Sequence, residues 1–260
     1  MESIKIKVLD CGQMDFEKYK LVATKDHSEP VTSPMQAILI KHPKLGNILF
    51  DTGNDDGWKD SYPEWVKKDF PITRHRSILE CLGEEGMTPG DIDILILSHM
   101  HLDHAGGLNR FANTKCAKGV ITAEADLREA FYTSGLSKES GGFYIRSTFS
   151  NIPGVEFKPT NGELKLAEDL IVFEQKAHTP ACLGLRINLK NTGTVLVVSD
   201  TVYTQESYDH CRGPEGALQD LNFVKNINVL KEMQKKYDAK IIFGHDYAQA
   251  TELQQRGWID

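Results

Sequence analysis

The chain has 260 residues, of which 40% are hydrophobic and 26% are charged, and this composition excludes a disordered chain. The formal net charge of −7 at pH 7 disfavours nucleic acid or an anionic membrane surface as a partner. A small neutral or cationic substrate is the better expectation, and the length favours a single domain spanning residues 1–260.

The N-terminal segment does not predict export. Residues 1–8 alternate between polar and apolar side chains, and no segment has the apolar length needed to cross a bilayer. The five cysteines are odd in number and scattered without a CxxC pair, which is typical of free thiols in a reducing compartment. We therefore expect a cytoplasmic protein, monomeric or homodimeric, that binds neither nucleic acid nor a membrane.

The N-terminal third predicts an antiparallel sheet. Residues 4–9, 35–42 and 47–50 have the composition of strands, and residues 43–46 supply the proline and glycine of a hairpin turn. Residues 54–74 are polar and rich in aromatic side chains, and we interpret them as a surface segment. Trp58, Trp65 and Phe70, with the loop at 141–144, are candidates for an apolar pocket wall, although ordinary packing explains them equally well.

The remainder alternates helices and strands, which is typical of a layered α/β protein. Ile78, Leu79 and Leu82 recur at helical spacing, residues 92–97 form a short β-rich run, and residues 122–134 predict a helix that ends at Gly135. Further strands are expected at 170–174, 183–189, 194–198 and 240–243, with an amphipathic helix over 221–237.

The strongest chemical signal directly follows the strand at 92–97. His99 and His101 are two residues apart in an extended segment, so their imidazoles can face one metal ion. If the chain then turns at residues 105–107, where glycines let the backbone pass close to the metals, Asp103 and His104 can face a second ion. Imidazole combined with carboxylate favours zinc or a similar metal over calcium or magnesium.

Three other strand ends carry matching groups. His178, Asp200 and His245 each follow a predicted strand. Open α/β sheets gather ligands outside the carboxyl ends of their strands, so these side chains are expected to meet the histidines near His101. A polar surface loop would explain a lone His-x-His, but it does not explain this convergence.

The pattern resembles the metallo-β-lactamase superfamily over about residues 49–246, with Asp51-Thr52-Gly53 resembling its first motif. The resemblance implies a four-layer αββα sandwich and two divalent metal ions, expected to be zinc. It further implies that Asp51 orients the ligand loop, although an ordinary turn role is the alternative. The implied ligands are His99, His101 and His178 for one ion, Asp103, His104 and His245 for the other, and Asp200 bridging both.

Within the superfamily, Asp200-Thr201-Val202-Tyr203 and Phe243-Gly244-His245-Asp246 most resemble the N-acyl-homoserine lactonase group. The resemblance implies that a hydroxide bridging the metals opens a lactone ring, either an N-acyl-homoserine lactone (quorum quenching) or a related lactone. Tyr203 would contact the substrate carbonyl, unless it only anchors a loop, and Asp103 or Asp200 would carry the proton. The similar 4-pyridoxolactonase shares much of this pattern.

One motif departs from the group. Where relatives have Gly-His-Thr-x-Gly-His, this chain has Ala177 and Ala181 in place of the glycines and Cys182 in place of the last histidine. The substitution of alanine for glycine costs little conformational free energy where φ is negative and more where φ is positive. Cys182 is expected to be a small buried residue at the start of a strand rather than a metal neighbour.

Other functions remain as alternatives. A glyoxalase II-like thioester hydrolase would use the same metal centre, but such relatives bind glutathione through a C-terminal helical extension, and residues 248–260 are short for one. A di-iron redox protein of this fold would usually have glutamate in place of His101. A nuclease is disfavoured by the acidic charge and by the lack of a clustered basic patch. A metal-binding protein without catalysis is disfavoured because every expected ligand position is filled.

Overall fold

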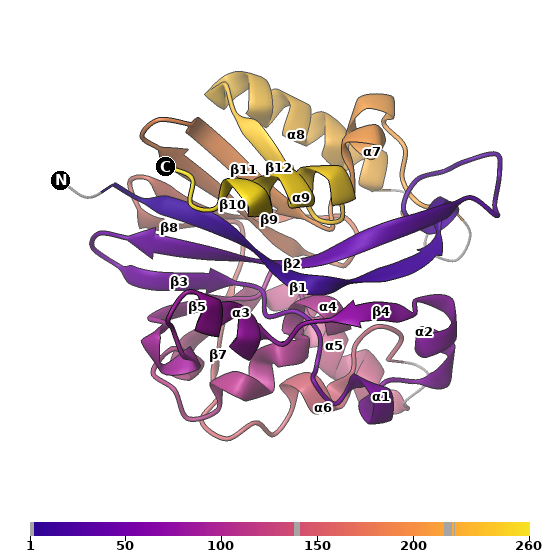
Figure 1. The fold of residues 1–260 in the computed structure, drawn as a ribbon, viewed down its shortest axis with the longest axis horizontal. Coiled ribbons are helices and arrows are strands. Elements are labelled where there is room, and N and C mark those ends of the chain that lie inside the picture. The colour runs from indigo at the N-terminus through magenta and orange to yellow at the C-terminus, as the bar shows by residue number, and fades with distance from the viewer. Residues whose placement is uncertain (1–2, 138–140, 216–219, 221) are drawn as a thin grey trace.

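The protein forms four layers. The computed structural model describes residues 3–137, 141–215, 220 and 222–260. Two β-sheets pack face to face, and helices cover the outer face of each sheet (Figure 1). The expected αββα sandwich is therefore confirmed. Within the described residues, no helix combines the length and the apolar character needed to span a membrane.

The larger sheet joins an antiparallel half to a parallel half. Its seven strands run in the order β4 (Ile72–His75), β1 (Lys5–Glu17), β2 (Pro30–His42), β3 (Gly46–Phe50), β5 (Ile94–Ile96), β6 (Val120–Ala123) and β7 (Phe157–Thr160). β4, β1, β2 and β3 pair antiparallel, as expected for the N-terminal third, whereas β3, β5, β6 and β7 pair in parallel.

The smaller sheet directs several strand ends to one edge. Its five strands run in the order β12 (Lys240–Phe243), β11 (Gly193–Ser199), β10 (Cys182–Leu189), β9 (Leu170–Gln175) and β8 (Glu163–Ala167). β10 is antiparallel to both β9 and β11, and β12 is parallel to β11. The carboxyl ends of β9, β11 and β12 therefore lie at the same edge.

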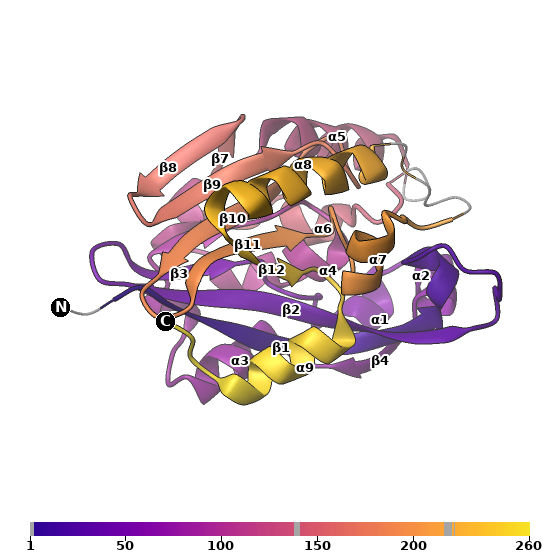
Figure 2. The same ribbon diagram turned by 90° about the horizontal axis from the view of Figure 1, so that it is seen from above.

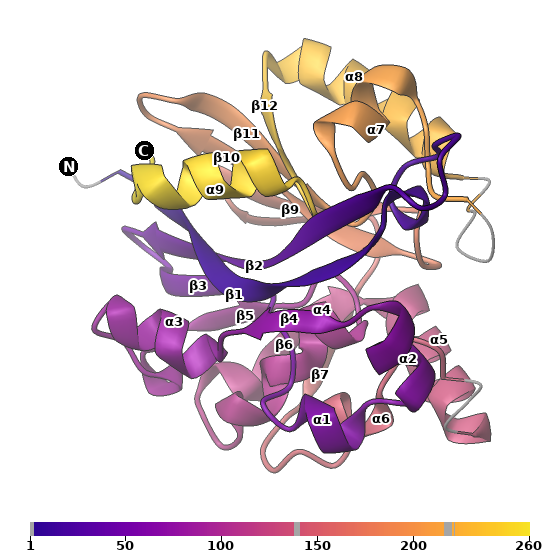
Figure 3. The ribbon, with the colours of Figure 1, turned by 45° about the vertical axis from the view of Figure 1, so that its right-hand side comes forward.

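Helices cover both outer faces. On the side of the larger sheet lie α1 (Trp58–Ser61), α2 (Glu64–Asp69), α3 (Ile78–Glu84), α4 (Leu102–Ala105), α5 (Glu124–Leu136) and α6 (Arg146–Phe149), and on the side of the smaller sheet lie α7 (Gln205–His210) and α8 (Phe223–Tyr237). Figure 2 shows α8 lying over the smaller sheet. The last helix, α9 (Tyr247–Arg256), packs on β1 and β2 beside the smaller sheet (Figure 3). Within the described residues, the connections include four short 3₁₀ helices: η1 (Lys18–Lys20), η2 (Pro89–Asp91), η3 (Gly106–Phe111) and η4 (Cys116–Gly119).

The hydrophobic core explains the uninterrupted apolar run in β2. Ile38 and Ile40 pack between the two sheets, whereas Ala37 and Leu39 belong to the cluster on the opposite face, under the helices. Successive side chains of a strand point to opposite faces, so a sheet that is covered on both sides needs apolar residues at every position.

Two sequence predictions need correction. The helix expected from residue 122 begins at Glu124, because the buried, partly β-branched run Val120–Ala123 pairs with β7 as strand β6. Residues 54–74 are more than a surface segment, because they form two helices and a strand and bury Tyr62 and Val66. The predicted helical residue Leu221 lies outside the described residues, and α8 begins at Phe223.

Candidate metal centre

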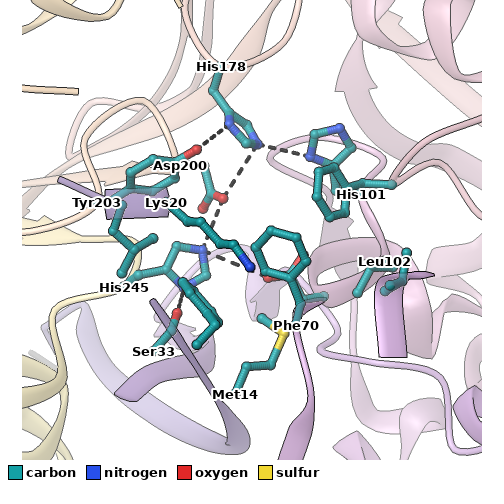
Figure 4. Close-up of a pocket in the computed structure, with 15 residues that line it drawn as sticks. Met14, Lys20, Ser33, Phe70, His101, Leu102, His178, Asp200, Tyr203 and His245 are labelled. Carbon is teal, nitrogen blue, oxygen red and sulfur yellow. Dashed lines mark hydrogen bonds and ion pairs between the residues drawn. The ribbon is translucent and has the colours of Figure 1, made fainter. Parts of the chain in front are cut away.

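Four loops bring the seven expected ligand residues together at one edge of the sandwich. The loops follow β5, β9, β11 and β12, in agreement with the predicted convergence of strand ends. Within each of three overlapping groups, the candidate ligand atoms lie within 4.8 Å of one another: His99, His101 and His178; His99, His104 and Asp200; and Asp103, His104 and His245. Figure 4 shows how His101, His178, Asp200 and His245 point toward one another.

One half of the cluster consists of imidazoles alone. His178 Nε2 lies 2.9 Å from His101 Nδ1 and 3.1 Å from His99 Nε2. Burial, together with the neighbouring histidines, holds the pKa of His99 and His101 well below the ordinary value, and burial also lowers the pKa of His178. These three rings are therefore neutral near pH 7, which is the form that binds a metal ion.

The other half of the cluster contains carboxylates. Asp103 Oδ2 lies 3.7 Å from His104 Nε2 and 3.8 Å from His245 Nε2. Burial alone would lower the pKa of His104 and of His245, but Asp200 and Asp103 outweigh it and raise both values. Without a metal ion, protonation of these two histidines balances the negative charge of the buried Asp103 and Asp200 carboxylates.

Asp200 lies between the two halves. Its Oδ2 is 3.0 Å from His245 Nε2 and 3.4 Å from His178 Nε2, and its Oδ1 is 3.1 Å from His104 Nε2. Burial acts to raise the pKa of Asp200, but the surrounding histidines hold it well below the usual range. A carboxylate in this position can contact two cations at once.

The donor atoms fit a pair of divalent cations. His104 Nε2 and Asp200 Oδ1 are buried and lie 3.1 Å apart, but this contact lacks hydrogen-bond geometry, and neither atom has a hydrogen bond to another described residue. Buried polar atoms without partners are costly, and a cation bound between them would satisfy both. The mixture of imidazole nitrogens and carboxylate oxygens suits zinc and similar transition metals.

Hydrogen bonds behind the cluster fix the histidine rings. Asp51 Oδ2 lies 2.8 Å from His104 Nδ1, and the same carboxylate accepts from the backbone N–H and the hydroxyl of Ser98. Ser33 Oγ lies 2.9 Å from Nδ1 of His245. Because the rear nitrogen of each ring is engaged, Nε2 faces the centre of the cluster. Asp51 thus occupies the supporting position expected from the sequence, and it does so with a φ of 68° directly after β3.

Tyr203 also contacts a cluster histidine. Its hydroxyl lies 2.8 Å from Nδ1 of His178, and its side chain lines the pocket described below. His178 has a φ of 69°, an uncommon backbone conformation for a histidine, and its backbone N–H donates to Asp220. The contact between Tyr203 and His178 was not predicted from the sequence.

Asp126 on α5 supports the loop that carries His99 and His101, and it was not predicted from the sequence. Its buried carboxylate accepts from the backbone N–H of Met100, between two of the candidate ligands, and from the hydroxyl of Tyr144. The Tyr144 ring in turn packs on His101, with ring centroids 4.6 Å apart. Burial raises the pKa of Asp126 to about 6. No motif marks this residue, because its partners are distant in the chain.

Two glycines permit close backbone contacts around the cluster. A Cβ at Gly107 would lie 2.4 Å from the carbonyl oxygen of Thr52, and a Cβ at Gly244 would lie 2.7 Å from the carbonyl oxygen of Ser199. The sequence predicts that the glycines after His104 let the backbone pass close to the metals. In the structure, Gly107 lets the ligand loop pack against the loop that carries Asp51.

The departures around His178 are structurally mild. Neither Ala177 nor Ala181 has a positive φ, so alanine fits at both positions without strain. Cys182 is fully buried at the first position of β10, as expected, and belongs to none of the possible metal-binding groups among the described residues. Burial raises the pKa of its thiol well above the ordinary value, which keeps the thiol neutral.

A pocket opens beside the cluster (Figure 4). Five of the seven candidate ligands border it, and apolar side chains form most of the remaining wall. The lining consists of Met14, Phe16, Lys20, Leu21, Ser33, Val66, Phe70, His101, Leu102, Asp103, Phe143, His178, Asp200, Tyr203 and His245.

Aromatic rings form one continuous wall of this pocket. The ring centroids are 5.0 Å apart for Phe16 and Phe70, 5.1 Å for Phe70 and Phe143, and 5.5 Å for Phe143 and His101. The wall expected from the aromatic segment and the 141–144 loop is therefore confirmed for Phe70 and Phe143. Trp58 and Trp65 do not line the pocket; Trp58 packs against the cluster that contains Tyr62, and Trp65 packs against Phe143 and is 36% exposed.

Comparisons with known proteins agree with this geometry. The family model of the metallo-beta-lactamase superfamily matches residues 34–245. N-acyl homoserine lactonase AttM of Rhizobium radiobacter is 24% identical over 263 residues, which cover 95% of this chain and 94% of that protein. An N-acyl homoserine lactonase of a Bacillus species is 26% identical over 252 residues, which cover 94% of each protein.

Solved structures give the same fold. An N-acyl homoserine lactone hydrolase with the product N-hexanoyl-L-homoserine bound at its catalytic metal center superposes with a TM-score of 0.79 at 22% identity, covering 97% of both chains. A quorum-quenching N-acyl homoserine lactone lactonase superposes with a TM-score of 0.75 at 23% identity, covering 96% of this chain and 95% of that one.

Proposed function

Because the chain belongs to the metallo-beta-lactamase superfamily, we propose that it is a metal-dependent hydrolase that opens the ring of a lactone. N-acyl-homoserine lactones, the substrates named for the relatives, are the first candidates. The observation that carries this proposal is the apolar, aromatic-walled pocket beside a cluster of histidines and aspartates. Such a pocket suits a neutral ring with an apolar substituent.

The proposed ligand sets follow the two halves of the cluster. One cation would be held by His99, His101 and His178, the other by Asp103, His104 and His245, and Asp200 would contact both. Zinc fits these donors best. When bound, such a pair of cations supplies a water of lowered pKa and an electrophile for the lactone carbonyl. Residues from both sheets contribute to this site, which supports a single domain for residues 1–260.

Tyr203 would hold the lactone carbonyl through its hydroxyl proton. If Nε2 of His178 binds a cation, Nδ1 must carry the ring proton, and Nδ1 then donates to the Tyr203 oxygen 2.8 Å away. The hydroxyl proton of Tyr203 is then free to point into the pocket. A donor placed there stabilises the negative charge that develops on the carbonyl oxygen during attack.

Asp103 and Asp200 are the proposed proton carriers. Both border the pocket, and neither is paired with a lysine or arginine among the described residues. A carboxylate that gives one oxygen to a cation retains another to accept the proton of the attacking water. That proton would then pass to the alkoxide released when the ring opens.

A substrate panel tests the proposal. The metal-loaded protein would be assayed with an N-acyl-homoserine lactone, a plain alkyl lactone, a glutathione thioester and a phosphodiester. We expect the highest kcat/KM with a lactone. A preference for the thioester would assign the chain to the glyoxalase II-like alternative, whereas a preference for the phosphodiester would exclude both.

A further inference from the structure

Apart from the candidate ligands, one charged side chain of the described residues lines the pocket. Lys20, the last residue of η1, borders the same space as Met14, Phe16 and Phe70. Its side chain is only 11% exposed, so the ammonium group lies at the pocket rather than extending into solvent. Figure 4 shows the Lys20 side chain extending toward the ring of Phe70.

The surrounding contacts hold this ammonium group in place. Lys20 Nζ donates to the backbone carbonyl of Asp69 at 2.8 Å and pairs with Glu17 Oε2 at 2.8 Å. It also lies over the Phe70 ring, 4.6 Å from the centroid. An ammonium group has three N–H donors, and the two oxygen contacts use two of them, which leaves one for a molecule bound in the pocket.

The local charge limits what that molecule can be. Glu17 already balances the charge of Lys20, so a carboxylate on the substrate would gain little net attraction and would lie near a second carboxylate. An alkyl chain that closes over the ammonium group would strip water from an N–H without replacing its hydrogen bond, which is unfavourable. An uncharged oxygen acceptor avoids both costs.

From these contacts we infer that Lys20 is a specificity-determining residue, which selects lactones whose side chain carries an uncharged carbonyl oxygen over lactones with a plain alkyl chain. This inference rests on the proposed lactonase function. The acceptor would be an amide or ketone oxygen within the substituent, while Phe70 and Phe143 would contact the apolar remainder.

A selectivity ratio tests the inference. The ratio is the kcat/KM for an N-acyl-homoserine lactone divided by the kcat/KM for an alkyl lactone with a side chain of equal length. In Lys20→Met, which keeps an unbranched side chain but removes the donor, this ratio should fall at least about tenfold, as expected for the loss of a hydrogen bond to a charged group. A third lactone with a carboxylate at the end of its chain should be a poorer substrate of the wild type than the N-acyl compound.

Lys18→Met is the matched control. Lys18 lies in the same 3₁₀ helix but pairs with Glu29 and Glu206 and does not line the pocket. This variant should keep the wild-type ratio. If Lys20→Met folds poorly, Lys20→Gln gives the same comparison, and bound metal and thermal unfolding verify each variant.

The possible outcomes separate the two proposals. An unchanged ratio in Lys20→Met, an equal loss for both lactones, or a wild-type preference for the carboxylate-bearing lactone would overturn the role of Lys20 while leaving the lactonase function intact. A wild-type protein that opens none of the three lactones would instead overturn the proposed function, and the inference with it.

Discussion

The hydroxyl of Tyr203 lies 2.8 Å from Nδ1 of His178, so the tyrosine expected to contact substrate also supports a candidate metal ligand. This hydrogen bond helps to fix the orientation of the His178 ring. From the sequence, Tyr203 was expected to contact the substrate carbonyl or to anchor a loop, and not to support a metal ligand. The structure therefore changes what removal of its hydroxyl is expected to do.

Tyr203→Phe should reduce both metal affinity and turnover. Loss of the bond to His178 should weaken metal binding by about tenfold, the lower end for residues that support a ligand. At saturating metal, kcat for a lactone should remain below the wild-type value, because the proposed donor to the carbonyl is missing. A chelator competition followed by kinetics at saturating metal separates the two effects. Wild-type kcat at saturating metal would show that Tyr203 only positions His178.

Asp51→Asn should loosen the half of the centre that contains His104. The amide cannot orient His104 as the carboxylate does while also accepting both bonds from Ser98, so metal affinity should fall about 10- to 100-fold. Asp56→Asn is a matched control, because Asp56 bonds Ser77 and Arg110 rather than a cluster residue. Equal affinities of the two variants in a zinc titration would show that Asp51 has only a turn role.

Asp126 should make stability depend on pH. Its pKa is raised by burial from 3.8 to about 6, so folding favours the neutral carboxyl group. This favourable contribution is complete below the unfolded pKa near 4 and is lost as the pH rises through about 6. The free energy of unfolding of the wild type, relative to Asp126→Asn, should therefore fall by on the order of 3 kcal/mol between pH 4 and pH 7.

Urea unfolding of both proteins in the metal-free state measures this difference. Removing the metal ions keeps their own pH-dependent binding out of the comparison. Asp209→Asn, which removes an exposed carboxylate on α7, is the control for the loss of one negative charge. A constant difference between the wild type and Asp126→Asn across this range would mean that the Asp126 carboxyl group does not titrate as described.

Asp200→Ala should have the largest effect, because Asp200 lies between both halves of the cluster. We expect fewer bound ions per chain and a loss of at least about 10³-fold in kcat/KM, since metal-ion catalysis supplies several kcal/mol. Asp209→Ala should retain wild-type metal content and activity. Elemental analysis together with lactone kinetics provides both values, and near-normal activity in Asp200→Ala would exclude the bridging role.

Much of the centre could be predicted from the sequence because strand order along the chain determines where loops meet. His178, Asp200 and His245 follow short apolar runs that are recognisable as strands, and parallel strands end at the same edge. The motif around His101 needed only local spacing. These ligand positions can therefore be predicted without knowing how the two sheets pack.

Other parts could not be predicted, because they depend on packing between distant segments. Thr122 and Ala123 directly precede the helix with no glycine or proline between, and only the pairing of Val120–Ala123 with β7 assigns these two residues to a strand. Asp126 and Lys20 look like ordinary surface charges in the sequence. Their roles depend on partners from other loops, namely Met100 and Tyr144 for Asp126 and the carbonyl of Asp69 for Lys20.

The central proposal is that the seven clustered residues hold two divalent cations that the protein needs to open lactones. The most direct measurement is the metal content of the purified chain, together with its N-acyl-homoserine lactone hydrolysis before chelation, after chelation and after metal is restored. We predict two ions per chain, loss of hydrolysis when they are removed and recovery when zinc is added back. Hydrolysis that continues at the original rate after all bound metal has been removed would contradict the account.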